Sequence, residues 1–113
     1  MEKNDTVIIS DDQNSPLAKK ISLNLHAEYK NIELRIFADG ESKIRLDNMA
    51  KKNCIIIHST YPPTDQHLMQ LFMIMYKCKE DGAKDICVVS PYLAYTRQDK
   101  VFVEGEIVTN DLV

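Results

Sequence analysis

The sequence predicts a single α/β domain in which a mostly parallel β-sheet is flanked by helices. Short β-branched runs alternate with amphipathic helical patterns along the chain, which is typical of parallel sheets. Two of the runs, residues 54–58 and 86–90, are apolar at successive positions, as strands covered on both faces should be. The length of 113 residues matches one domain with one core.

The chain starts with a predicted strand and a predicted helix. Thr6–Ser10 is a short β-branched run and is the first strand. Ser15 is the expected N-cap of the helix, and Pro16 occupies the first helical position, where its missing N–H costs nothing. One apolar stripe follows at helical spacing, and it consists of Leu17, Ile21 and Leu25.

The next segment predicts a strand, a turn and another short strand. Residues 31–37 alternate apolar and charged side chains, which indicates a strand with one wet face near the edge of the sheet. An Asp-Gly pair within residues 38–40 turns the chain. Residues 42–46 then form the second strand of this segment.

The second half of the chain predicts strand, helix and strand. The covered strand 54–58 is followed by a Pro-Pro break, and Thr64 or Asp65 caps a helix that runs to about residue 80. Gly82 is the expected stop, ahead of the covered strand 86–90. The helix is expected to bury Leu68, Leu71, Phe72 and Met75. Residues 109–111 look like the start of another helix.

Composition excludes several classes of function. Fourteen Lys and Arg against seventeen Asp and Glu give a net charge of −3, so nucleic acid is not an expected partner. No apolar stretch reaches the roughly 20 residues that a membrane span needs, and no leader is visible, so we expect a cytoplasmic protein. The three scattered cysteines predict reduced thiols beside a core rather than disulfides or a zinc site.

Ligands of open α/β sheets bind beyond the carboxyl ends of the strands, and the loop 37–41 is the first candidate there. Phe37 can stack on a flat base, and the carboxylates of Asp39 and Glu41 can accept hydrogen bonds from ribose or base donors. Gly40 permits close approach of the backbone. The alternative is a plain turn with Phe37 in the core.

Two later loops are also candidates. The hydroxyls of loop 59–65 precede a helix N-terminus and suit either phosphate binding or helix capping. Loop 91–100 combines tyrosines with Arg97, Gln98 and Lys100, which suit phosphate oxygens and an adenine edge; the alternative is a solvated loop. His58 ends a strand and is either a ligand or a satisfied structural histidine.

Taken together, loops 37–41, 59–65 and 91–100 resemble the N-terminal half of ribose-phosphate pyrophosphokinases, also called phosphoribosyl pyrophosphate synthetases. The order and spacing agree across essentially the whole chain, most specifically in the Tyr-x-x-Tyr-x-Arg-Gln-Asp-Lys stretch that ends at Lys100. The residues that follow it are most similar to archaeal members. The resemblance implies a phosphoribosyltransferase-like N-terminal domain.

The resemblance also implies an activity and a set of site residues. The family transfers the β,γ-diphosphoryl group of ATP to ribose 5-phosphate with Mg²⁺, mostly by positioning and charge neutralisation. It implies that Arg97 and Gln98 hold the adenine and phosphates of ATP, and that Phe37 belongs to a loop that meets the ATP of a neighbouring subunit, so a homo-oligomer is expected. The implied ATP-binding residues are Phe37, Asp39, Glu41, Arg97, Gln98, Asp99 and Lys100.

By the same resemblance, residues 1–113 are an N-terminal domain of a longer, two-domain protein, and the C-terminal domain is absent. No catalytic residue and no metal ligand is expected in this chain, so the Mg²⁺ ligands lie outside it. We therefore expect the 113 residues to be inactive alone. The alternative is a non-catalytic nucleotide-binding or assembly module that pairs with a full-length synthetase.

Overall fold

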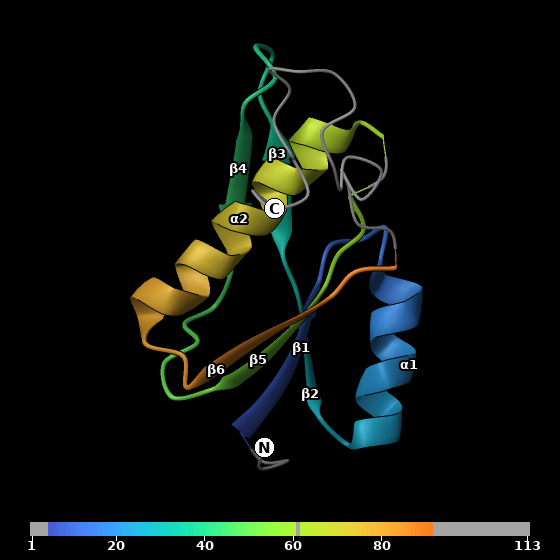
Figure 1. Ribbon diagram of the computed structural model, residues 1–113, viewed down its shortest axis with the longest axis vertical. Coiled ribbons are helices and arrows are strands. Elements are labelled where there is room, and N and C mark those ends of the chain that lie inside the picture. Colours follow the sequence, from blue (N-terminus) through green and yellow to red (C-terminus); the bar gives the residue numbers. More distant parts are fainter. Residues whose placement is uncertain (1–4, 61, 92–113) are drawn as a thin grey trace, which may run out of the picture.

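The computed structural model describes residues 5–60 and 62–91. Its centre is a four-stranded parallel sheet with the strand order β2-β1-β5-β6 (Figure 1). The sheet strands are β1 (Thr6–Ser10), β2 (Glu28–Asn31), β5 (Asn53–Ile57) and β6 (Asp85–Val89). The helices are α1 (Ser15–Leu25) and α2 (Thr64–Asp81). The predicted fold class is therefore confirmed.

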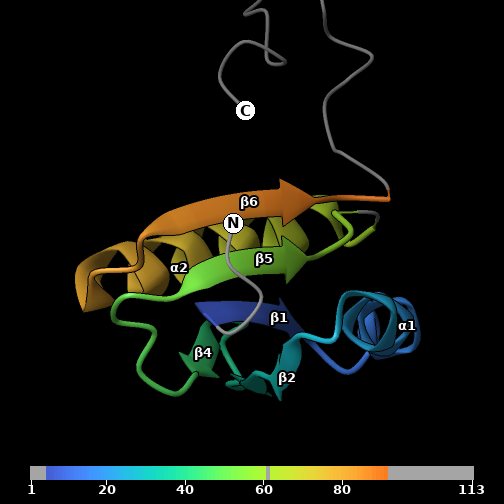
Figure 2. The ribbon, with the colours of Figure 1, turned by 90° about the horizontal axis from the view of Figure 1, so that it is seen from below.

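The direction of winding reverses in the middle of the sheet. The chain passes from β1 through α1 to β2 on one side, and from β5 through α2 to β6 on the other. Because such crossovers are right-handed, the two helices cover opposite faces, as Figure 2 shows. A topological switch point therefore lies between β1 and β5, at the edge where these strands end.

Alternating side chains of β1 and β5 fill two core layers. Val7, Ile9 and Ile56 pack toward α2, where they meet Leu71 and Ile74. On the other face, a smaller cluster joins both strands to α1, and it consists of Ile8, Ile57 and Ala18. The predicted two-sided burial of the 54–58 strand is therefore confirmed. Each fully buried aliphatic side chain stabilises the fold by about 1.5–3 kcal/mol.

Helix α1 differs from its prediction at the cap and at the buried face. Asn14, rather than Ser15, is the N-cap residue. The buried residue of the helix is Ala18, whereas Leu17 and Leu25 are about 40% exposed. The small Ala18 side chain lets the helix approach Ile8 and Ile57 closely, which turns the predicted leucine stripe partly away from the sheet.

Helix α2 ends at Gly82, which has the expected left-handed conformation (φ +88°). Its N-cap is Pro63 rather than Thr64 or Asp65, without a side-chain capping bond. The prediction that Phe72 belongs to the buried face of the helix is wrong, because its side chain is 42% exposed. No helix in the described part of the chain combines the length and apolarity that a bilayer span requires.

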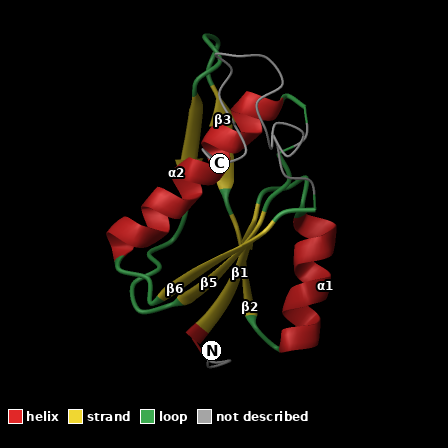
Figure 3. Cartoon of the chain, viewed as in Figure 1, coloured by secondary structure: helices red, strands yellow, loops and turns green. Residues whose placement is uncertain are grey.

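The predicted strand 31–37 is two strands in two different sheets. β2 ends at Asn31, and β3 (Glu33–Ile36) pairs antiparallel with β4 (Ser42–Arg45) in a hairpin that stands beside α2 (Figure 3). The break falls at Ile32, which is buried and whose N–H donates to the Ser10 carbonyl (2.9 Å). Because β1 ends at Ser10, the chain loses its ladder partner there and pairs with β4 instead.

Strand β6 is at the edge of the described sheet and is covered on one face only. Ile86 and Val88 pack against the core, whereas Cys87 and Val89 are exposed, so the predicted two-sided burial is wrong here. The face is open because α1 covers only the β1 and β2 side of the sheet. All three cysteines are free thiols, and only Cys54 and Cys78 lie in the core.

Candidate functional site

A buried polar cluster lies at the carboxyl ends of β1 and β5, at the switch point of the sheet. Asp11 follows β1 and accepts hydrogen bonds at Oδ1 from the Asn14 backbone N–H (3.0 Å) and side-chain amide (2.6 Å). His58 follows β5 and is fully buried. Its Nδ1 lies 3.8 Å from Asp11 Oδ2, so two residues far apart in sequence meet at this edge.

The two nitrogens of His58 have different surroundings. Nε2 lies 2.9 Å from the His67 carbonyl oxygen and therefore carries the proton that it donates. Nδ1 has no hydrogen-bond partner among the described residues. Burial lowers the pKa of His58, although the Asp11 carboxylate favours the charged ring. His58 is thus a buried neutral imidazole, but its Nδ1 has no partner among the described residues, so the interpretation as a satisfied structural histidine is not confirmed.

This burial makes the stability of the chain depend on pH. As pH falls below about 6.5, the unfolded chain takes up a proton at His58 before the folded chain does. The stabilisation is complete above pH 6.5 and is lost toward acid, by at most about 1.4 kcal/mol per pH unit. We expect urea unfolding at pH 7.5 and 5.5 to show a smaller loss for His58→Gln than for the wild type.

The exposed His26 provides the matched control for this experiment. His26→Asn suits the left-handed backbone at that position (φ 52°) and should keep the wild-type pH slope. Equal slopes for His58→Gln and the wild type would contradict the assignment of a buried neutral His58.

The 37–41 loop is the turn of the β3–β4 hairpin. The Gly40 N–H donates to the Phe37 carbonyl (2.9 Å), and the Phe37 N–H donates to the Glu41 carbonyl (2.8 Å). Asp39 Oδ1 accepts from the Glu41 N–H (3.0 Å), and Gly40 takes the positive φ (+92°) that the turn requires. The predicted turn is confirmed, and one carboxylate oxygen of Asp39 holds it closed.

Phe37 is not in the core. Its side chain is 39% exposed, and the Arg35 guanidinium carbon lies 5.4 Å from the ring centroid. The cation–π attraction between the Arg35 guanidinium and the ring stabilises the position of Phe37 at the surface. The alternative that placed Phe37 in the core is therefore wrong, and the ring is accessible for stacking.

A hollow of about 300 Å³ separates the hairpin turn from the first half of α2. The buried Gln70 lies beside it and donates from Nε2 to Ser42 Oγ (3.2 Å), which ties α2 to β4. Its Oε1 has no partner among the described residues. Sequence reasoning missed Gln70, although its spacing of four from Ile74 and eight from Cys78 places it on the buried face.

Loop 59–65 is largely described by the structure, whereas loop 91–100 is not beyond residue 91. In loop 59–65 the hydroxyls of Ser59 and Thr60 are buried, whereas Thr64 at the start of α2 is half-buried, so phosphate binding by this loop stays a prediction. Arg97, Gln98, Asp99 and Lys100 lie outside the described residues.

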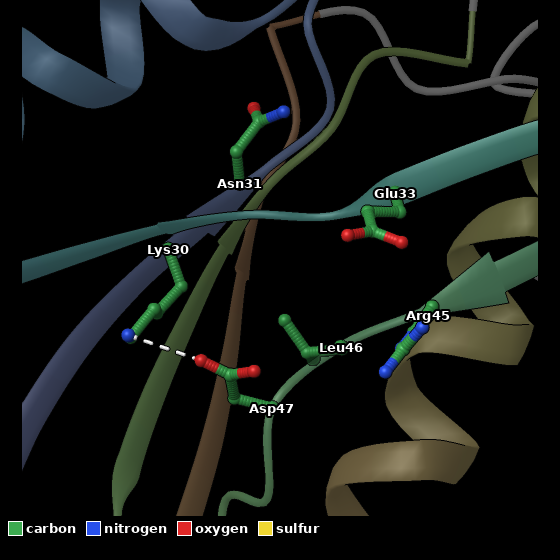
Figure 4. A pocket seen from close by; sticks show the side chains of 6 residues that line it. All are labelled: Lys30, Asn31, Glu33, Arg45, Leu46 and Asp47. Carbon is green, nitrogen blue, oxygen red and sulfur yellow. Dashed lines mark ion pairs between the residues drawn. The ribbon is translucent and has the colours of Figure 1, made fainter.

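A polar pocket of about 180 Å³ lies where β2 passes into β3 (Figure 4). Lys30 Nζ binds Asp47 Oδ2 (3.0 Å) and Glu28 Oε1 (3.4 Å), and these carboxylates raise the pKa of Lys30. The ion pairs tie the base of the hairpin to the sheet. Across residues 5–60 and 62–91, no three His, Cys, Asp or Glu side chains gather as metal ligands, and the location of the Mg²⁺ ligands stays a prediction.

Sequence comparisons relate the chain to one family. A family model described as the N-terminal domain of ribose phosphate pyrophosphokinase matches residues 6–113. The ribose-phosphate pyrophosphokinase of Sulfolobus acidocaldarius is 36% identical over 108 residues, which cover 95% of this chain and 37% of the relative. The Methanobrevibacter smithii protein of the same name is 35% identical over 107 residues, with 95% and 36% covered.

Structural comparison agrees with the sequence match. The phosphoribosylpyrophosphate synthetase of Mycobacterium smegmatis superposes with a TM-score of 0.87 at 26% identity, covering 97% of this chain and 37% of that chain. A purine phosphoribosyltransferase of Pyrococcus horikoshii shares the fold alone, with a TM-score of 0.59, 20% identity, and coverage of 81% of this chain and 65% of that one. The chain spans little more than a third of the length of the curated relatives it matches.

Proposed function

Because this chain belongs to the ribose phosphate pyrophosphokinase family, whose N-terminal domain it matches, we propose that it supplies the ATP-binding side of a ribose-phosphate diphosphokinase. The reaction transfers the diphosphoryl group of ATP to ribose 5-phosphate and yields phosphoribosyl pyrophosphate and AMP. The observation that carries the proposal is the exposed Phe37 ring on the hydrogen-bonded turn of the β3–β4 hairpin.

The ATP contacts come from two segments. Phe37 stacks on the adenine, while Glu41 and the free oxygen of Asp39 accept hydrogen bonds from base or ribose donors. Arg97 and Lys100 neutralise phosphate oxygens, and the contacts of this segment are completed by Gln98 and Asp99. Phe37 serves the ATP of a neighbouring subunit, so the working form is a homo-oligomer.

The catalytic step uses groups outside residues 1–113. Bound Mg²⁺ would neutralise charge on the transferring phosphates. Within this chain the described residues gather no set of three metal-ligating side chains. By the family resemblance we assign the metal and the ribose 5-phosphate site to residues outside this chain, so that this chain binds and orients ATP.

A chimera tests this division of labour. Residues 1–113 are joined to the remaining C-terminal part of the Sulfolobus acidocaldarius relative, and AMP and phosphoribosyl pyrophosphate are measured with ATP, Mg²⁺ and ribose 5-phosphate. We expect turnover by the chimera and none by the chain alone. Product formation by the isolated chain would contradict the division, and an inactive but folded chimera would contradict the assigned function.

The second candidate is a non-catalytic module that binds nucleotide or assembles with a full-length synthetase. It shares with the first candidate the proposed ATP contacts of loops 37–41 and 91–100. The codons after Val113 separate the two candidates, because a stop codon supports the module and an open frame supports the enzyme domain.

A further inference from the structure

The β3–β4 hairpin carries its charges on one face. In the antiparallel register, Arg35 lies directly opposite Lys43, and Glu33 lies opposite Arg45. Directly opposed residues point to the same face of a ladder, and so do residues two apart along a strand. The apolar pair Leu34 and Ile44 takes the other face, on which Ile44 packs against the core. We call the face with Arg35, Lys43, Arg45 and Glu33 the cationic face.

The three cations of this face lack carboxylate partners. Among the described residues, Arg35, Lys43 and Arg45 take part in no ion pair. Like charges directly opposite each other destabilise a sheet, and Arg35 and Lys43 are such a pair. This local positive charge contrasts with the net charge of the whole chain, which is −3. Within the described part of the chain, this face therefore carries three cations and one carboxylate, that of Glu33 opposite Arg45.

The cationic face is also hollow. A depression of about 340 Å³ is lined by Glu33, Leu34, Arg35, Lys43 and Arg45. Pockets for small ligands start at roughly 300 Å³, so the depression is large enough for a small molecule. It is a different space from the 300 Å³ hollow between the turn and α2.

We infer that the cationic face binds a small polyphosphate through Arg35, Lys43 and Arg45, none of which is among the proposed ATP contacts, although Arg35 adjoins Phe37. One phosphate group fits between the opposed Arg35 and Lys43, about 5 Å apart at Cβ. Arg45 lies two residues further along the strand, about 7 Å away, which is farther than one phosphate reaches. The three cations together match a chain of two or three phosphates, either free or as the tail of a nucleotide.

The charge balance favours a small ligand over a macromolecule. A nucleic acid would extend beyond the hairpin, and the net charge of −3 would repel it. The carboxylate of Glu33 lies opposite Arg45 and bounds the cationic face at the end of the hairpin away from the turn. A short polyanion meets only the three cations and avoids the acidic remainder of the surface.

Binding to the complete chain tests the inference with tripolyphosphate, ATP and adenosine as probes. The double variant Lys43→Gln/Arg45→Gln removes two cations and leaves Arg35 in place beside Phe37. We expect it to weaken tripolyphosphate binding at least tenfold, as the loss of charged hydrogen bonds implies. Lys19→Gln/Lys20→Gln removes two exposed charges from α1 and should leave the affinity unchanged.

Three further arms separate the outcomes. Equal loss for tripolyphosphate and ATP supports a site for any polyphosphate, whereas a loss for tripolyphosphate that is clearly exceeded by the loss for ATP points to the tail of a nucleotide as the bound group. Phe37→Ala should leave tripolyphosphate binding intact, so failure of the ATP proposal is distinguishable from failure of this one. Unchanged tripolyphosphate affinity in the double variant, or tighter binding of an oligonucleotide than of tripolyphosphate, would overturn the inference.

Discussion

In the chimera with the Sulfolobus acidocaldarius C-terminal part, Arg97→Ala is expected to lower kcat/KM for ATP by about 100-fold. A planar guanidinium can donate two parallel hydrogen bonds to phosphate oxygens, which is the contact we propose for Arg97. Charged hydrogen bonds contribute about 1.5–3 kcal/mol each, so losing even part of this pair accounts for two powers of ten. Steady-state kinetics with ATP and ribose 5-phosphate varied separately should show the loss for ATP and little change in KM for ribose 5-phosphate.

Two measurements separate this binding role from a structural role. Arg97→Lys retains the charge but not the fork, so it should recover only part of the lost activity. If Arg97 acts through ATP alone, the melting temperature of Arg97→Ala should stay within about 2 °C of the wild type, because substitutions that remove no packing or buried hydrogen bond change stability by less than about 0.5 kcal/mol. A larger drop in melting temperature would mean that Arg97 supports the fold.

The fold class was predictable because local patterns decide it. The uninterrupted run from Ile55 to Ile57 needs cover on both faces, and the structure supplies it with a helix on each side. Gly82 ends α2 because the left-handed conformation there favours glycine. The break at Ile32 was not predictable in this way, since it depends on where β1 ends and not on the sequence of residues 31–37.

The site was predictable only where one segment forms it. The Asp39–Gly40 pair indicates a turn by itself, whereas the sequence leaves open whether Phe37 is in the core, and the structure shows it exposed. The His58–Asp11 contact joins the ends of two strands, so it depends on the sheet order. The cationic face likewise requires the hairpin register, because Arg35 and Lys43 are ordinary surface residues until the register places them opposite each other.

The second large effect on activity is expected for Phe37, which we propose acts across the boundary between two subunits. In the same chimera, Phe37→Ala should lower activity by about 10–100-fold, since stacking of a base on an aromatic ring contributes about 1–3 kcal/mol. If Phe37 serves a neighbour's ATP, a mixed oligomer of Phe37→Ala and Arg97→Ala subunits contains some intact sites. With random mixing, half of the sites receive an intact Arg97, and half of those an intact Phe37, so about a quarter of wild-type activity should return.

A double variant supplies the control for the mixing experiment. Phe37→Ala mixed with Phe37→Ala/Arg97→Ala has no Phe37 in any subunit, so its activity should stay at the level of Phe37→Ala or below. The two subunit types carry different affinity tags, and tandem purification establishes that mixed oligomers have formed. Mixed oligomers without restored turnover would assign Phe37 and Arg97 to the same chain's site, because only a shared site allows two defective subunits to complement each other.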